Sequence, residues 1–165
     1  MKNRTLLIFL FVTCTITINA ENVYIRSDAN GNNSGTDWDN ALVALPWRYE
    51  WIRGNTYYIA DGEYNAGSKG SFELRTEVDQ SKYIVIKKAT EKDHGTSVGW
   101  DSTYGDGTAE FIDNIVIYTS YWIFDGVTGF DDGTIQHYGF KVTNTDPVTG
   151  NRQAPNSDHD RQRHG

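Results

Sequence analysis

The chain has few of the residues that cross-link a protein or make it basic. Of its 165 residues, one is cysteine, one is methionine and three are proline. Fifteen lysines and arginines face 22 aspartates and glutamates, so the formal net charge is −7. This shortage of positive charge argues against nucleic-acid binding and against docking on an anionic membrane, because both need a basic surface. It also disfavours a polyanionic glycan as partner, unless Ca²⁺ bridges the two.

The single cysteine, Cys14, lies in an N-terminal segment typical of a secretory signal peptide. Residues 1–4 are basic, residues 6–12 are apolar, and Ala20 stands at the expected cleavage position. The apolar run is too short for a stable membrane span. We therefore expect residues 1–20 to be removed on export, leaving a secreted (extracellular or periplasmic) chain without disulfides or a membrane span. An uncleaved anchor and lipid attachment at Cys14 stay open as alternatives.

The rest of the chain is rich in short β-branched and aromatic runs bounded by Gly, Asp, Asn or Ser, which is typical of strands. Eight runs are predicted as strands: 22–26, 56–60, 71–75, 83–88, 109–112, 115–118, 121–124 and 138–142. An amphipathic helical turn is expected over residues 37–45, ahead of Pro46. Residues 59–62 recur as 123–126, and 83–86 resemble 114–117. Recurrence and near-continuous apolar runs favour a parallel solenoid over the open alternative, an antiparallel sandwich with Asp-Gly hairpins.

The order of six segments carries a resemblance to known proteins: 23–25, 28–36, 38–46, 53–64, 83–89 and 115–127. In this order the chain resembles the N-terminal part of right-handed parallel β-helix proteins of the pectate-lyase-like superfamily. The resemblance implies an all-β fold in which a short N-terminal cap and the first coils occupy residues 21–143. It does not imply one activity, because this fold hosts lyases, hydrolases, epimerases and adhesins.

Residues 144–165 form a polar tail in which Val148 is the sole sizeable apolar residue. Such a tail cannot bury enough surface to order itself, so we expect it to be disordered. No segment after Val142 is apolar enough to cover the end of a coil. The expectation is an N-terminal piece of a longer protein, ended by truncation or frameshift, or a monomer if the chain is complete.

The resemblance implies an exported carbohydrate-active protein that is similar to polysaccharide lyases, with polysaccharide as partner. A noncatalytic glycan-binding or adhesin-type protein and an inactive incomplete product are the alternatives. A uronate lyase neutralises the sugar carboxylate with Ca²⁺ or Arg and removes a proton with a side-chain base. His137 and Lys141 share one face of a predicted strand and are catalytic candidates, with Asp131 and Asp132 as metal candidates on the preceding turn. A polar surface strand explains the same pattern.

A second candidate metal site is the turn that begins at Asp28. Asp28, Asn30 and Asn32 offer oxygen ligands at the first, third and fifth positions, and Asp39 stands at the twelfth. This spacing is similar to that of a calcium loop, although Asn33 replaces the usual glycine. Asx turns that satisfy their own backbone are the alternative. Asp61-Gly62 and Asp125-Gly126 are interpreted as turn chemistry rather than as catalytic carboxylates.

Aromatic side chains are the candidates for contact with sugar rings. Trp47 and Tyr49 alternate along the chain, and Trp100 and Tyr104 lie in a predicted loop. The alternative is packing under the first coil, which we expect for Trp38 and Trp51. Trp122 is expected in the core, and His94 is expected to be solvated.

Overall fold

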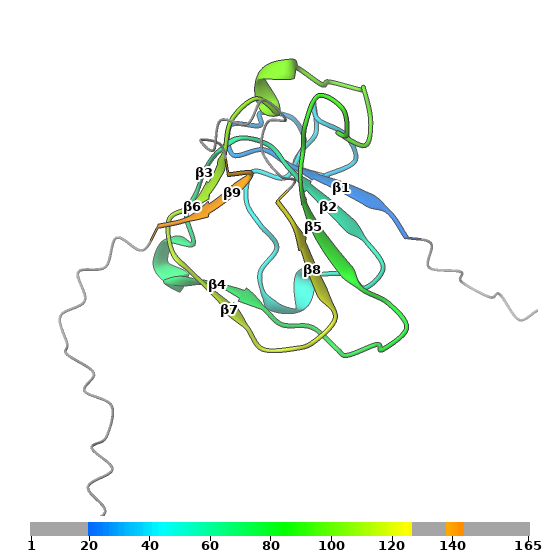
Figure 1. Ribbon diagram of the computed structural model, residues 1–165, viewed down its shortest axis with the longest axis vertical. Helices are drawn as coiled ribbons and strands as arrows, with labels where there is room; N and C mark the ends of the chain where they lie inside the picture. The colour runs from blue at the N-terminus through cyan, green and yellow to red at the C-terminus, as the bar shows by residue number, and fades with distance from the viewer. Residues whose placement is uncertain (1–19, 127–137, 144–165) are drawn as a thin grey trace, which may run out of the picture.

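A computed structural model describes residues 20–126 and 138–143 (Figure 1). Residues 1–19 of the predicted signal peptide, His137, Asp131, Asp132 and the predicted tail 144–165 lie outside these residues. The described part has nine strands and three 3₁₀ helices. The strands are β1 Asn22–Ile25, β2 Thr56–Ile59, β3 Gly62–Tyr64, β4 Ser71–Leu74, β5 Ile84–Lys88, β6 Ala109–Phe111, β7 Asn114–Ile117, β8 Trp122–Asp125 and β9 Phe140–Val142. The 3₁₀ helices are η1 Arg48–Glu50, η2 Gly67–Lys69 and η3 Ser102–Tyr104.

The strands form three parallel sheets that the chain visits in turn. Sheet A has the order β1-β2-β5-β8, sheet B the order β3-β6-β9, and sheet C pairs β4 with β7. All ladders between these strands are parallel. From β2 onward, successive strands join sheets A, B and C in repeating order, so each circuit adds one strand to each sheet (Figure 1). The all-β prediction is confirmed, and the antiparallel sandwich is wrong.

The apolar core lies between the three sheets. It takes Ile59 and Ile86 from sheet A, Phe111 from sheet B, and Phe72 and Leu74 from sheet C. Strand β5 shows the alternation directly, because its buried and half-exposed residues follow one another in turn. This pattern is that of strands with one face on a core and one face outside. The parallel ladders therefore stack inward-facing side chains into apolar rows.

Residues 37–45 do not form the predicted helical turn. The amide of Leu42 donates to the carbonyl of Tyr24 at 2.8 Å, and the amide of Arg26 donates to the carbonyl of Leu42 at 2.9 Å. Leu42 thereby forms a parallel bridge with Ile25 on the edge strand β1. Pairing with a sheet edge satisfies the same backbone groups that a helix would use, so tertiary context overrides the local pattern.

The predicted burial of two tryptophans is confirmed. Trp38 and Trp51 are both buried. Trp38 and Leu45 enter different clusters, however, so they do not form one apolar face. Trp38 packs with Tyr24 and Tyr58 on the outer side of sheet A. Gly35 and Leu42 lie along the outer edge of β1, because the amide of Tyr24 donates to the carbonyl of Gly35 at 3.0 Å and Leu42 bridges to Ile25.

The two sequence recurrences do not occupy equivalent positions. Ile59 is in register with Lys88, whereas Ile123 is in register with Val85, three residues earlier on β5. Residues 83–86 belong to sheet A and residues 114–117 to sheet C. Strand β3 was not predicted, because it is three residues long and starts at Gly62, whose φ is 124°. The recurrence reflects shared strand chemistry rather than a sequence repeat.

Candidate functional site

An open groove of about 430 Å³ lies where β4 and β7 of sheet C end. It is lined by Tyr49, Arg75, Thr76, Glu77, Val78, Tyr118 and Thr119. Arg75 directly follows β4, and Tyr118 directly follows β7. The parallel register places these two residues side by side, since Leu74 pairs with Ile117 and the amide of Tyr118 donates to the carbonyl of Leu74 at 3.0 Å.

Arg75 and Tyr118 contact each other in the lining of the groove. The guanidinium carbon of Arg75 lies 4.0 Å from the centre of the Tyr118 ring. No acidic side chain in the described part of the chain forms an ion pair with Arg75. Tyr118 is 50% exposed. The guanidinium is therefore held against an aromatic ring in a residue that lines the groove.

Tyr49 comes to the groove from η1. The preceding residue, Arg48, has φ 52°, a left-handed conformation that is uncommon for a residue with a side chain. Arg48 donates two hydrogen bonds to Glu73 of β4, at 2.7 and 3.2 Å. These bonds raise the pKa of Arg48 and hold η1 against sheet C. Tyr49 stays 63% exposed beside them.

The walls of the groove are tied to the fold by two further side chains. The buried Thr76 hydroxyl donates to the carbonyl of Trp51 at 3.1 Å. Arg53 donates to the carbonyl of Glu77 at 2.9 Å and to that of Ser120 at 2.9 Å. The chain segments on both sides of the groove are thus fixed by one guanidinium. The groove is therefore held in shape by hydrogen bonds from neighbouring segments of the fold.

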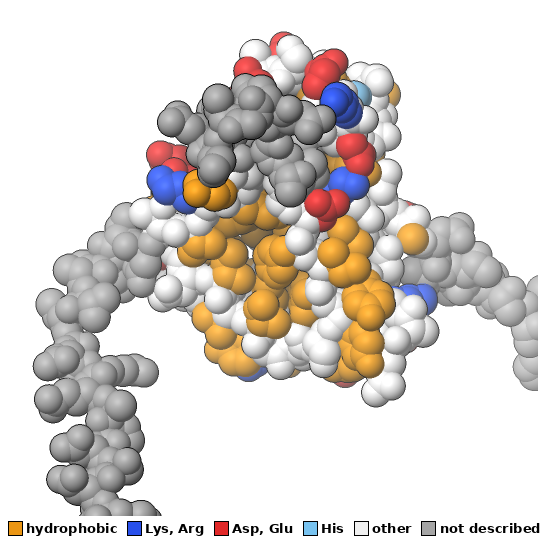
Figure 2. All heavy atoms as spheres, viewed as in Figure 1, with side chains coloured by type: hydrophobic (Ala, Val, Ile, Leu, Met, Phe, Trp, Pro, Cys, Tyr) orange, Lys and Arg blue, Asp and Glu red, His pale blue; other side chains and the backbone are white. Residues whose placement is uncertain are grey.

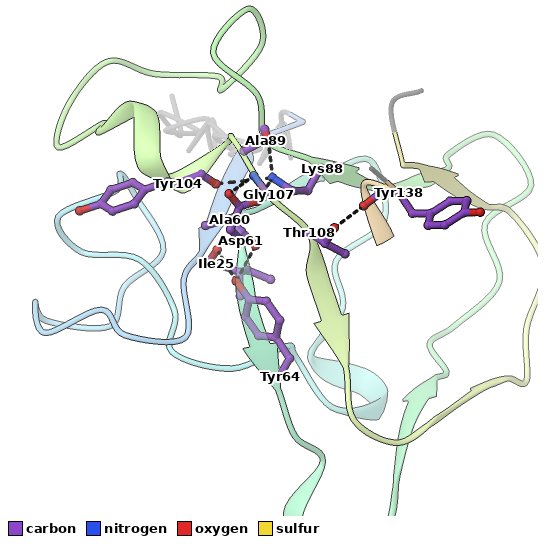
Figure 3. Close-up of polar contacts among 10 residues, drawn as sticks. All are labelled: Ile25, Ala60, Asp61, Tyr64, Lys88, Ala89, Tyr104, Gly107, Thr108 and Tyr138. Carbon is purple, nitrogen blue, oxygen red and sulfur yellow. Dashed lines mark hydrogen bonds and ion pairs between the residues drawn. The ribbon is translucent and has the colours of Figure 1, made fainter. Parts of the chain in front are cut away.

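A second polar cluster lies between the three sheets (Figure 3). Lys88 reaches from β5 toward Asp61, whose carboxylate also accepts the amide of Gly107, and toward the carbonyl of Ala89 (Figure 3). Tyr64 donates to the carbonyl of Ala60 at 3.0 Å in the same region. Burial lowers the pKa of Lys88. Because Lys88 is almost fully buried, this cluster joins chain segments and offers no surface to a ligand.

A third polar group lies on the outer face of sheet A. Tyr24, Tyr58, Lys87 and Asp125 are in register across its four strands. Lys87 forms an ion pair with Asp93 at 2.5 Å and lies 3.5 Å from Asp125. The hydrogen bond to Asp93 raises the pKa of Lys87. Lys87 is therefore a fixed cation between two carboxylates rather than a base.

Three of the four residues predicted to form a calcium loop contact other groups of the protein. Asp28 pairs with Arg26 at 3.0 Å, and the side-chain oxygen of Asn32 accepts the amide of Ser34 at 2.9 Å. Asp39 packs against the turn at Gly99. Asn30 lies in the same exposed turn. Among residues 20–126 and 138–143, no group of three or more His, Cys, Asp or Glu side chains is arranged to hold a metal ion.

The predicted aromatic contacts fall in three places. Tyr49 lines the groove. Trp47 is half-buried and flanked by two cations, with the Arg48 guanidinium 4.0 Å and the Lys69 ammonium 4.9 Å from its ring centre. Trp100 and Tyr104, also half-buried, pack over Trp38 on the far side, outside sheet A.

The expectation that His94 is solvated is wrong, because its ring packs against another side chain. Its ring stacks on Trp100 with centres 4.3 Å apart and planes 8° from parallel. One ring nitrogen of His94 also lies 3.2 Å from the carbonyl of Glu91. His94 is thereby part of the loop that covers the tyrosines of sheet A.

The predicted catalytic pair is described in part. Lys141 lies on β9 and forms an ion pair with Glu110 of β6 at 2.9 Å, in register with it. His137, Asp131 and Asp132 lie outside the described residues, so their role stays a prediction. Hydrogen bonds from Thr143 and Lys141 lower the pKa of Glu110. Lys141 is thus held by a strand neighbour on the surface of sheet B.

Sequence reasoning did not find Arg75 and Tyr118. Each was placed at the end of a predicted strand, 71–75 and 115–118, with no chemical role. The signal that would have found them is the register between the two strands, which aligns their C-terminal ends. That register is not readable from either segment alone.

Comparisons with protein-family models, with curated proteins and with solved structures give no match for this chain. The functional interpretation therefore rests on the residues themselves. Within residues 20–126 and 138–143, no helix has the length and apolar character needed to cross a bilayer.

Proposed function

We propose that this chain belongs to an exported protein that binds acidic polysaccharide, and that its sheets begin a right-handed parallel β-helix. The visiting order of the three parallel sheets supports the β-helix, as does the resemblance to the pectate-lyase-like superfamily. The signal-peptide pattern of residues 1–20 supports export. The groove on sheet C supports the binding role.

The observation that carries the proposal is the Arg75 guanidinium stacked on Tyr118 in an open groove beside exposed Tyr49. Arg presents a planar fork of donors that matches a carboxylate in two hydrogen bonds. Exposed tyrosines offer flat apolar faces with a polar edge, which suit a sugar ring. A groove open at the surface admits a chain rather than a small enclosed ligand.

The negative net charge of the whole chain disfavours a polyanionic partner, but the groove itself contains a positively charged side chain. The lining of the groove includes Arg75, and Arg53 lies behind its wall, while Glu77 is the one carboxylate among the lining residues. Arg75 therefore offers a positive charge to a polyanion in this groove, although the chain as a whole is acidic. Ca²⁺ is therefore not required for binding in this proposal.

Binding is the activity proposed for this groove. Its lining residues include no His, no Lys and a single carboxylate, so Tyr49, Tyr118 and Arg75 are the side chains there that could serve as a base. The lyase hypothesis depends on His137 and its neighbours, which the structure does not describe. Release of an unsaturated uronate product is the measurement that would add catalysis to binding.

The test is titration of the purified chain with polygalacturonate, followed by calorimetry, with a neutral glucan as the comparison ligand. Arg75→Gln should weaken polygalacturonate binding about 10- to 100-fold, because one charge-assisted, two-pronged hydrogen bond is worth about 1.5–3 kcal/mol. Tyr49→Ala should weaken it about 10-fold through lost stacking. Both residues line the groove at its surface, so the variants should fold.

Lys92→Gln is the matched control, because Lys92 is exposed and its substitution changes the net charge equally. It should leave the affinity unchanged. Equal losses in Lys92→Gln and Arg75→Gln would show that binding is a general charge effect and would remove the groove from the proposal. Equal affinity for the neutral glucan would contradict recognition of a carboxylate.

A further inference from the structure

Strand β4 has a cation held against an aromatic ring at each of its ends. After the strand, the Arg75 guanidinium lies 4.0 Å from the centre of the Tyr118 ring. Before the strand, in η2, the Lys69 ammonium lies 4.9 Å from the centre of the Trp47 ring. Both distances are within the range of a cation–π contact. No carboxylate in the described part of the chain forms an ion pair with either cation.

Residues 47–49 run beside β4 from one of these pairs to the other. The segment begins at Trp47, which contacts Lys69. Its middle residue, Arg48, donates two hydrogen bonds to Glu73 within the strand, at 2.7 and 3.2 Å. Its last residue lines the groove at the other end of the strand. The two cation–aromatic pairs therefore belong to one stretch of the molecule, with an internal ion pair between them.

The side chains of this stretch share the outer side of sheet C. Residues 71–76 alternate between half-exposed and buried, and both Glu73 and Arg75 are half-exposed. Because successive side chains of an extended chain point to opposite sides, Glu73 and Arg75 lie on the same outer side. The Arg48 guanidinium reaches Glu73 there and lies 4.0 Å from the centre of the Trp47 ring. Trp47 therefore holds its cations on the side of sheet C that carries Arg75.

We propose that an acidic polysaccharide binds along β4 and places two of its carboxylates on Arg75 and Lys69. This inference rests on the proposed function, because the contact with Arg75 is the one proposed for the groove. Arg48 and Glu73 neutralise each other, so positive charge is presented at two separate points. The strand between these points has four residues, and its first and last Cα atoms are about 10 Å apart at about 3.3 Å per residue. A monosaccharide, with one carboxylate, can occupy one of the two cations at a time.

Carboxylates near Lys69 limit where the ligand can lie. Lys69 is exposed at a second open groove, of about 440 Å³, which Glu21 and Glu50 also line. The carboxylate of Glu50 accepts the amide of Trp47 at 2.7 Å. Two carboxylates repel a polyanion, so we place the ligand across Lys69 and along β4 rather than inside this groove. On the face that Figure 2 shows, acidic side chains lie mainly in the upper half of the view, away from β4 and β7 (Figure 1).

Two contacts on one ligand chain make affinity depend on the length of that chain. Once the first carboxylate is bound, the second contact forms within the complex, so it adds to affinity without a second loss of translational freedom. A ligand too short to span β4 cannot make both contacts at once. Affinity should therefore rise with oligomer length until the ligand spans the strand and should then level off.

The test is calorimetry of the full chain with galacturonate and with its linear oligomers of increasing length, up to polygalacturonate. The wild-type chain should bind the long oligomers more tightly than the short ones. Lys69→Gln should weaken the binding of long oligomers about 10-fold, because a hydrogen bond between charged groups is lost. It should also remove the dependence on length. Lys69→Arg keeps the cation and should retain that dependence.

Lys92→Gln is the matched control for Lys69→Gln, because both lysines are exposed and both substitutions remove one positive charge. Equal losses in these two variants would overturn the contact with Lys69. Affinity that does not change with length in the wild-type chain, while Arg75→Gln still weakens binding, would overturn this inference and leave the proposed function standing. No binding of polygalacturonate by the wild-type chain would overturn both.

Discussion

The ammonium nitrogen of Lys88 lies 2.5 Å from a carboxylate oxygen of Asp61, inside the coil. In the two preceding strands of sheet A, the positions in register with Lys88 are Ile59 and Ile25. The buried row that begins with Ile25 and Ile59 therefore continues with a charged residue, Lys88. Lys88 also donates to the carbonyl of Ala89 at 2.6 Å, so its burial is compensated by hydrogen bonds from two directions.

Lys88→Met should lower the free energy of unfolding by about 3–5 kcal/mol. Methionine fits an apolar row, but its introduction leaves the Asp61 carboxylate without its counter-ion in a poorly solvated place. The double variant Lys88→Met/Asp61→Asn should lose less than the sum of the two single variants, because the residues share one interaction. Urea denaturation of the four proteins measures the coupling.

Lys87→Met is the matched control for Lys88→Met. Lys87 neighbours it in sequence but faces outward, and surface ion pairs contribute about 0–1 kcal/mol. If Lys87→Met were as damaging as Lys88→Met, the buried position would not be the cause. Strict additivity in the double variant would show that Lys88 and Asp61 do not depend on each other.

Four tyrosines should control unfolding at high pH. Burial raises the pKa of Tyr24, Tyr57, Tyr58 and Tyr64 above the ordinary value of 10.0. Above that pH the unfolded chain has released phenolic protons that the folded chain retains. Stability is therefore fully present below pH 10 and is lost as pH rises above it, because the unfolded chain then binds fewer protons than the folded chain.

An alkaline titration that records phenolate absorbance and circular dichroism together measures this effect. The four buried phenols should ionise in one cooperative step that coincides with the loss of β structure. Full phenolate absorbance in a chain that is still folded would contradict the burial of these side chains. Tyr57→Phe, which keeps the ring, should make the alkaline loss of stability less steep.

Strand chemistry made most of this fold predictable. The eight predicted strands correspond to eight observed ones, with ends that differ by two residues or fewer. Runs of β-branched and aromatic residues between turn residues were sufficient to predict these strands, because each strand places its own apolar side chains in the core. The prediction of a helical turn at 37–45 was wrong because backbone groups of this segment pair with β1. The local sequence pattern gives no sign of this distant partner.

The candidate site was predictable only in its parts. Tyr49 was identified because it alternates with Trp47 and Trp51 along the chain. Arg75 and Tyr118 are 43 residues apart, and only the register of β4 with β7 brings them together. Binding surfaces on coiled sheets are built across strands, so their residues show no spacing along the chain.

Trp51 and Trp122 should differ in their contribution to stability. Trp51 is buried, whereas Trp122, expected in the core, lies at its margin and meets Trp51 edge to face at 5.4 Å between ring centres. Trp51→Ala should cost about 3–5 kcal/mol, the usual range for a buried large aromatic. Trp122→Ala should cost less, about 2–3 kcal/mol, because part of its surface is already in water. Equal losses in thermal or urea unfolding would place Trp122 fully in the core.

Gly95 is where the loop over sheet A approaches its tyrosines most closely. Its φ is 72°, and a β-carbon there would lie 2.7 Å from the Tyr24 hydroxyl and 2.9 Å from the Tyr58 ring. Gly95→Ala should therefore combine backbone strain of about 1–2 kcal/mol with overpacking of about 1–3 kcal/mol.

Gly67→Ala separates the two effects of Gly95→Ala. Gly67 has a similar φ of 59°, but nothing lies within 4 Å of an added β-carbon. It should cost the strain alone, so the difference between the two variants in urea unfolding measures how tightly the loop rests on Tyr24 and Tyr58. Since His94 and Trp100 flank this loop, Gly95→Ala should also change the near-ultraviolet circular dichroism of the aromatic cluster, and Gly67→Ala should not. Equal destabilisation by the two substitutions would show that the loop yields to the added methyl group and does not hold these tyrosines in place.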